Sequence, residues 1–147
     1  MTAGAETLNP RLQEIAEEFG AVGDRDRLQL LLEFSDDLPP LPARYAEHRD
    51  LMEPVPECQS PLFLAVEVDD DAVVHLFFDA PREAPTTRGF AGILHAGLDG
   101  LGADEVLQTP GEFSSQLGLH DLVSPLRLRG MAAMLARIKR QGREQRG

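Results

Sequence analysis

Two short apolar runs near the middle of the chain limit the folds that this sequence can adopt. Residues 62–68 and 72–78 are rich in β-branched and aromatic side chains, and only the three aspartates 69–71 separate them. Such runs, joined by a short polar connection, are typical of an antiparallel hairpin. Both runs are almost continuously apolar, so we expect helices to cover both faces of the hairpin. An exposed face would show a cleaner alternation of polar and apolar residues.

Helical patterns fill the chain before the predicted hairpin. Asn9-Pro10 indicates the start of a helix that ends near Gly20, and Asp24 is the expected N-cap of a second helix. A proline-rich connector, residues 38–42, and a short helical turn at 43–48 should follow. The second helix is expected to bury one face, made of Leu28, Leu31, Leu32 and Ser35.

Helical patterns also follow the hairpin. We expect Thr86 or Thr87 to cap a helix that carries several glycines, a composition that suggests close backbone approach to a neighbour. Short helices are expected at 103–107 and 111–117, and Ser124-Pro125 predicts the start of a long amphipathic helix. Residues 141–147 are expected to form a frayed tail.

These elements predict an α+β fold. Two N-terminal helices and several C-terminal helices should flank a small antiparallel sheet of two to three strands. A chain of 147 residues suits a single domain spanning residues 1–147. No apolar stretch approaches the roughly eighteen residues of a membrane helix, and the N-terminus lacks a secretory pattern. We therefore expect a soluble cytoplasmic protein with no membrane partner.

Charge is unevenly distributed along the chain. The formal net charge is −11, yet seven basic residues and one acid lie between residue 127 and the end. A strongly acidic body argues against binding of nucleic acid. For the basic segment we favour a solvated helix face, with positive charge placed well at a helix C-terminus, over contact with RNA or a membrane.

Cys58 is the only cysteine. It cannot form a disulfide within the chain, and the four scattered histidines do not complete a zinc site with it, so we expect no metal. A lone thiol is either a small buried hydrophobe or a nucleophile, and both readings remain open. A Cys-His hydrolase would need His75 or His120 as the base, and no sequence signature supports that arrangement.

Three motifs carry a resemblance to a known family. They are Pro56-Glu57-Cys58-Gln59-Ser60 ahead of the first apolar run, Thr87-Arg88-Gly89 at the start of a helix, and Ser124-Pro125-Leu126-Arg127 with Gly130. In this order and spacing they resemble the SufE family of sulfur acceptors in iron-sulfur cluster assembly, over residues 8–140. The resemblance implies an α+β fold of the kind shared with IscU-like scaffolds.

The resemblance also implies roles for individual residues. Cys58 matches the sulfur-accepting cysteine, and Gln59 and Ser60 belong to the loop that presents it. Arg88-Gly89 matches the family's Arg-Gly, and Arg127 matches an arginine near the partner-facing surface. For both arginines a structural role is an equal alternative. Glu57 departs from the family, in which many relatives have glycine, and its carboxylate should raise the pKa of the neighbouring thiol.

Partners and mechanism follow from the resemblance. A SufS-like, pyridoxal phosphate-dependent cysteine desulfurase would donate persulfide sulfur to Cys58, which would pass it to a SufB-like scaffold. The chain would then need no cofactor of its own, because the pyridoxal phosphate belongs to the desulfurase. It would act as a sulfur-transfer accessory and desulfurase activator, and whether it counts as an enzyme is left open. The lack of long heptads fits a monomer or a weak dimer.

Two further expectations concern the thiol. A persulfide is easily reduced or oxidised, so Cys58 should be shielded at rest, and we expect Leu62, Phe63 and the glycine-bearing helix to cover it. The alternative function is a non-catalytic adaptor that docks a desulfurase or scaffold while Cys58 is only structural.

Overall fold

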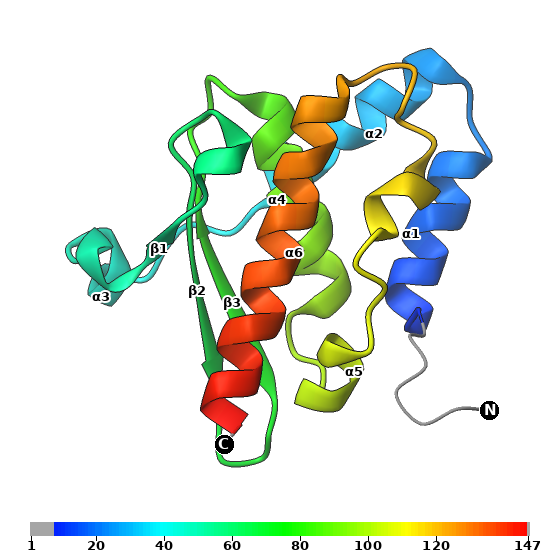
Figure 1. The fold of residues 1–147 in the computed structure, drawn as a ribbon. Coiled ribbons are helices and arrows are strands. Elements are labelled where there is room, and N and C mark those ends of the chain that lie inside the picture. Colours follow the sequence, from blue (N-terminus) through cyan, green and yellow to red (C-terminus); the bar gives the residue numbers. More distant parts are fainter. Residues whose placement is uncertain (1–7, 147) are drawn as a thin grey trace.

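The computed structural model describes residues 8–146 (Figure 1). A three-stranded antiparallel sheet and its helices form an α+β fold, as predicted. Residues 1–7, on which the secretory expectation was based, and residue 147 lie outside the described residues. The elements in chain order are α1 (Pro10–Gly20), α2 (Asp24–Asp37), α3 (Ala43–Ala46), the 3₁₀ helix η1 (Arg49–Leu51), β1 (Glu53–Pro54), the 3₁₀ helix η2 (Pro56–Cys58), β2 (Phe63–Val68), β3 (Val74–Asp79), α4 (Pro85–Leu98), α5 (Ala103–Leu107), the 3₁₀ helix η3 (Phe113–Leu117) and α6 (Pro125–Arg146).

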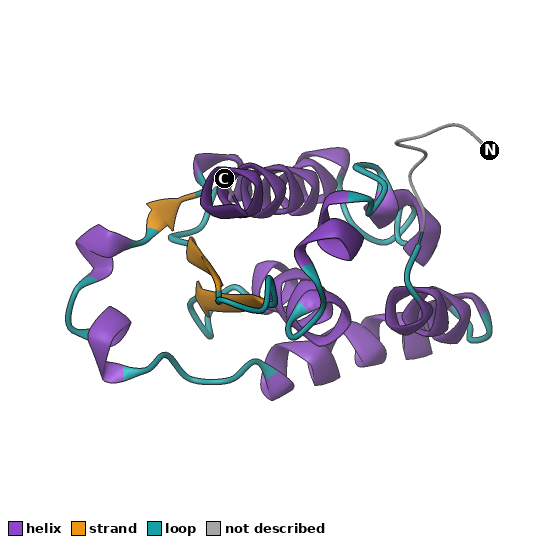
Figure 2. Ribbon diagram, turned by 90° about the horizontal axis from the view of Figure 1, so that it is seen from below, coloured by secondary structure: helices purple, strands orange, loops and turns teal. Residues whose placement is uncertain are grey.

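The sheet has the order β1-β2-β3, and β2 and β3 form the predicted hairpin. The long helix α6 runs alongside β2, and α4 packs against α2 and α6 (Figures 1 and 2). Leu64 and Val66 point into the main hydrophobic core. Ala65, on the opposite face of β2, joins a smaller cluster with Tyr45 and Met52. The first face is covered by helices, as expected. The second is covered only in part, by the segment around α3 and η1, and Phe63, His75 and Phe77 on it are half-buried.

Two of the expected helix caps are present. The side chain of Asn9 accepts hydrogen bonds from the backbone N–H groups of Arg11 and Leu12, at 2.9 and 3.1 Å. Ser124 Oγ accepts from Arg127 N at 3.3 Å at the start of α6. Each cap satisfies backbone donors that the first turn of a helix leaves without partners.

The other two predicted caps are wrong. Gly23 is the N-cap of α2, and Asp24 is its first helical residue, where a carboxylate still interacts favourably with the helix dipole. Helix α4 begins earlier than expected, at Pro85, because proline is well suited to the first helical position. Thr87 is consequently a buried residue within the first turn.

The buried face of α2 differs from the prediction. Leu31 and Ser35 are buried, but Leu28 and Leu32 remain 40% and 41% exposed. The cause is the close approach of α4, since a Cβ added to Gly89 would lie 2.6 Å from the carbonyl oxygen of Leu31. The expected close backbone contact of the glycine-bearing helix is thus confirmed. It buries the face of α2 that carries Leu31 and Ser35 and leaves Leu28 and Leu32 outside the contact.

The C-terminal segment is ordered into helix, so the predicted frayed tail is wrong for residues 141–146. Gln141 and Gln145 accept hydrogen bonds from the backbone N–H groups of Val66 and Val68, at 3.0 and 2.9 Å. Strand β1 pairs only with Phe63 and Leu64, so this edge of β2 would otherwise leave donors open. The two glutamines satisfy those donors and hold the end of α6 against the sheet. The helix expected at 111–117 is the shorter η3.

Candidate functional site

Cys58 lies at the end of η2, beneath α6, with 4% of its surface exposed. Its Sγ donates a long hydrogen bond to the carbonyl oxygen of Gly130, at 3.6 Å. A Cβ added to Gly130 would lie 3.1 Å from both Sγ and Cα of Cys58. The absence of a side chain at residue 130 therefore lets α6 approach the thiol this closely without displacing it.

The local backbone explains how the thiol is held. Pro56 occupies the first position of η2, and Gln59, directly after Cys58, adopts a left-handed conformation with φ +59°. The Gln59 N–H bonds to the Pro56 carbonyl at 3.0 Å, which closes the turn. Val55 N donates to Leu62 O at 2.9 Å, so both ends of the segment 55–62 are joined. The thiol sits on a short loop with pinned ends.

A small pocket of about 100 Å³ opens beside the thiol. The structure brings together here three predicted residues of the loop and one from α6, together with an exposed leucine. The lining residues are Cys58, Gln59, Ser60, Leu126 and Arg127.

Glu57 also lies at this site and has a partner that the sequence did not suggest. Its Oε1 is 2.9 Å from Nη2 of Arg137, and its Oε2 accepts from Nη1 at 3.2 Å. Arg137 is seven residues, or two helical turns, beyond Gly130 on the same face of α6. The unusual Glu57, together with that spacing, is the sequence signal that could have identified this pair.

The electrostatics around Cys58 favour the protonated thiol. Burial is the main cause that raises the pKa of Cys58 from 9.0 to about 11; the Glu57 carboxylate acts in the same direction, and the Arg137 guanidinium opposes both. At neutral pH only about one thiol in ten thousand would be ionised in this closed state. The expected effect of Glu57 on the thiol has the predicted direction. A buried, protonated thiol is a poor nucleophile until its surroundings change.

Arg88 and Gly89 lie away from this pocket, at the α2–α4 contact. The Arg88 guanidinium donates to the carbonyl oxygens of Ser35 and Ala80, at 2.9 and 2.6 Å. Burial lowers the pKa of Arg88. These contacts link α4 to the end of α2 and to the segment after β3. Arg88 and Gly89 therefore have a structural role in holding these elements together.

The expected cover of the thiol is partly wrong. Leu62 is buried in the same core as Cys58, but Phe63 packs with the cluster on the opposite face of the sheet. The glycines of α4 face α1 and α2, and it is Gly130 of α6 that lies against the sulfur. A glycine does allow a helix to lie close to the thiol, as expected, but that glycine is in α6 and not in α4.

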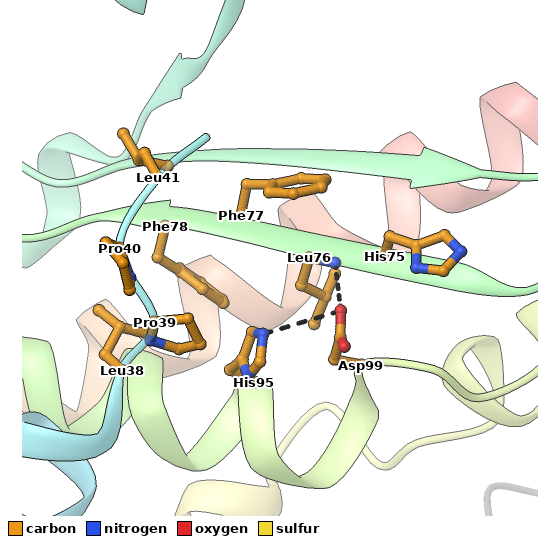
Figure 3. A pocket seen from close by; sticks show the side chains of 10 residues that line it. All are labelled: Leu38, Pro39, Pro40, Leu41, His75, Leu76, Phe77, Phe78, His95 and Asp99. Carbon is orange, nitrogen blue, oxygen red and sulfur yellow. Dashed lines mark hydrogen bonds and ion pairs between the residues drawn. The ribbon is translucent and has the colours of Figure 1, made fainter. Parts of the chain in front are cut away.

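The histidines do not line the Cys58 pocket. His75 Nε2 lies 2.9 Å from Asp69 Oδ2 near the hairpin turn, and His120 lines a separate groove. His75 also lines a pocket of about 180 Å³ between the proline-rich connector and β3, in which His95 faces Asp99 at 3.8 Å (Figure 3). Neither His75 nor His120 is placed as the base of a Cys-His hydrolase.

Neither a metal site nor a membrane-spanning helix is found within residues 8–146. No cluster of three histidine, cysteine, aspartate or glutamate side chains in this range could hold a metal ion. No helix in the same range has the length and apolar character needed to cross a membrane.

Comparison with known proteins agrees with this geometry. Residues 13–142 match the family model described as "SufE: Fe-S metabolism associated domain". An uncharacterized SufE-like protein of Mycobacterium tuberculosis is 58% identical over 144 residues, covering 98% of this chain and 99% of the relative. SufE-like protein 1 of Arabidopsis thaliana, described as chloroplastic/mitochondrial, is 27% identical over 92% of this chain and 36% of its own length.

A solved structure shows the same fold. The solution structure of a hypothetical protein from Thermus thermophilus superposes with a TM-score of 0.84 and 37% identity, covering 95% of this chain and 98% of that one. The fold, the matched family model and the near full-length relative agree with one another. The chain belongs to the SufE family and to the proteins of iron-sulfur metabolism.

Proposed function

We propose that this protein accepts sulfur from a cysteine desulfurase on Cys58 and passes it to an iron-sulfur cluster scaffold. The Cys58 thiolate attacks the terminal sulfur of a persulfide on the desulfurase. A new S–S bond forms on Cys58, the S–S bond of the donor breaks, and the donor cysteine leaves as a thiolate. The proton of the terminal sulfur stays with the transferred group, and no external oxidant or reductant is needed.

The observation that carries this proposal is the placement of Cys58. The thiol sits on a short loop whose two ends are hydrogen-bonded together, α6 covers it, and Arg127 lines the pocket beside it. This arrangement suits a sulfur carrier that becomes reactive only when a partner docks. A single sulfur on each partner suffices for relay, whereas holding a cluster would require several ligands. Membership of a family associated with iron-sulfur metabolism supports the same role.

The proposal includes the partners. The donor is a SufS-like desulfurase that carries its own pyridoxal phosphate, and the acceptor is a SufB-like scaffold. This chain then needs no cofactor or metal, and it acts as a monomer or weak dimer in the cytoplasm. A reducing compartment keeps the lone thiol available between transfers.

Sulfur transfer can be tested by mass. The protein is incubated with a SufS-like desulfurase from the same organism, pyridoxal phosphate and cysteine, and its intact mass is recorded without reductant. We expect a gain of one sulfur atom on the wild type, removal of that sulfur by dithiothreitol, and no gain on Cys58→Ser. A wild-type protein that stimulates the desulfurase but never gains sulfur contradicts the relay.

A non-catalytic adaptor is the second candidate. The observation that favours it is the burial of Cys58 against Gly130, which would also suit a packing role. An adaptor predicts that Cys58→Ala still stimulates the desulfurase as well as the wild type does. Relay predicts that stimulation in the presence of scaffold is lost with the thiol.

A further inference from the structure

One ion-pair network joins α6 to the segment that carries Cys58. Arg137 contacts Glu57 in η2 through two nitrogens, at 2.9 and 3.2 Å. The same guanidinium places Nε 3.2 Å from Glu53 Oε2 in β1, and Glu53 is also bonded by Arg140 and by Gln141. Glu57 is thus held by Arg137, whereas Glu53 has several partners on α6.

Arg137 would keep most of its contacts if Glu57 left this network. If the Cys58 loop moves outward, the guanidinium keeps its contact with Glu53 and its hydrogen bond to Ala133 O, at 3.3 Å. Nε of Arg137 is buried and already lies 3.2 Å from Glu53 Oε2, without a well-aligned hydrogen bond, so a small rotation of the guanidinium can improve this contact. Outward movement of the Cys58 loop therefore leaves no unpaired charge on α6. An unpaired charge is the usual reason why separating a partly buried ion pair costs stability.

We propose that the Glu57–Arg137 ion pair is a latch that holds Cys58 beneath α6, and that a cationic side chain of the docking partner opens it by pairing with Glu57. The side chain of Glu57 is 47% exposed and that of Arg137 is 20% exposed. A competitor from solvent therefore reaches the carboxylate more easily than the guanidinium. The proposal deepens the sulfur-acceptor function, on which it rests.

The exchange has a chemical consequence at the sulfur. In the closed state, Glu57 is one of the groups that raise the pKa of Cys58. A partner cation on Glu57 would neutralise that carboxylate as the loop leaves its buried position. Both changes favour the thiolate, so docking would release the thiol and activate it in one step.

The first test measures the rate constant for alkylation of Cys58 by iodoacetamide, with no desulfurase present. We expect Glu57→Gln and Arg137→Gln each to react about fivefold faster than the wild type, the effect of removing one partly exposed ion pair. The double variant should react at nearly the same rate as the single variants, because they remove the same interaction. Glu144→Gln is the matched control, since it removes a Glu–Arg pair with Arg140 on the same helix and should leave the rate unchanged.

The Arg137→Gln variant separates a latch from simple electrostatics. Arg137 lowers the pKa of Cys58, so its loss through charge alone would make the thiol less reactive. A faster reaction supports the latch, and a slower one overturns it. Exchange of the amide protons of Cys58 and Gln59 gives a second readout of loop opening that does not depend on thiol ionisation, and protection should fall in both variants.

The partner's charge is tested with tetra-arginine, compared with sodium chloride at equal ionic strength. We expect the peptide to raise the alkylation rate of the wild type about twofold and to leave Glu57→Gln unchanged. No acceleration, or equal acceleration of both proteins, overturns the cationic partner. These assays use no desulfurase, so a protein that fails to accept sulfur can still show the latch, and the two failures are distinguishable.

Discussion

Cys58 Sγ lies 3.6 Å from the carbonyl oxygen of Gly130, and this contact defines the closed state of the site. The two residues belong to elements far apart in the sequence, η2 and α6. The approach is possible because Gly130 has no side chain. The same contact that buries the thiol also ties the reactive loop to the last helix.

Gly130→Ala should destabilise the closed state. The new Cβ would lie 3.1 Å from Cys58 Cα and Sγ, so η2 must shift by a few tenths of an ångström. Overpacking of this kind costs about 1–3 kcal/mol, of which the helix preference of alanine offsets about 1 kcal/mol. Urea denaturation should show the loss, and alkylation of Cys58 should become faster. Gly142→Ala is the control on the same helix, because nothing lies within 4 Å of its added Cβ and alanine favours helix by about 1 kcal/mol.

Gly89→Ala should lower stability without a specific effect on sulfur transfer. Its Cβ would lie 2.6 Å from the backbone oxygen of Leu31, which cannot move without displacing α2. We expect a loss of about 2–3 kcal/mol in the free energy of unfolding. Sulfur transfer per folded molecule should stay near the wild-type value, and a selective loss of transfer at unchanged stability would contradict a structural role.

Arg127→Ala should impair sulfur transfer at almost unchanged stability. The residue is exposed and lines the Cys58 pocket, where its positive charge can stabilise the thiolate that leaves the donor. We expect the rate of sulfur gain to fall about tenfold, while the free energy of unfolding changes by less than about 0.5 kcal/mol. Arg129→Ala, an exposed arginine outside this pocket, should transfer sulfur normally.

The buried thiol should make stability depend on alkaline pH. The pKa of Cys58 is raised from 9.0 to about 11 in the folded protein, so the folded state binds the proton more tightly than the unfolded state. The protonated thiol therefore contributes to the free energy of unfolding. This contribution is fully present below pH 9 and is lost as the pH rises from 9 towards 11, by an amount of the order of 2 kcal/mol. Denaturation of the wild type and of Cys58→Ala at several pH values should show this difference in slope. Parallel slopes would contradict a buried thiol.

Gln145→Ala should loosen the end of α6. Its side chain accepts a hydrogen bond from Val68 N at 2.9 Å, and its loss should cost about 1 kcal/mol. Amide exchange of Val68 should become faster, measured by NMR. Arg143→Ala, an exposed substitution on the same turn, should leave that exchange unchanged.

Some of the site could be predicted because it depends on local sequence. The proline-bracketed loop, the strand that follows it and the Ser124-Pro125 helix start all follow from residues that are neighbours in the chain. The wrong predictions have two causes. The starts of α2 and α4 lie within three residues of the predicted caps, where neighbouring residues give competing local signals, such as Pro85 at the first position of α4. The frayed tail is wrong for a tertiary reason, because Gln141 and Gln145 bond to β2.

The sequence by itself determined the elements of the α+β fold, the lone nucleophile and the family motifs, because each is written in residue type and short spacing. Only the tertiary structure decided which helix covers Cys58 and what neutralises Glu57. Glu57 and Arg137 are 80 residues apart in the chain, and their pairing depends on how α6 docks on η2. Such docking is set by the fit of whole surfaces, here by the missing side chain of Gly130, which no local pattern reveals.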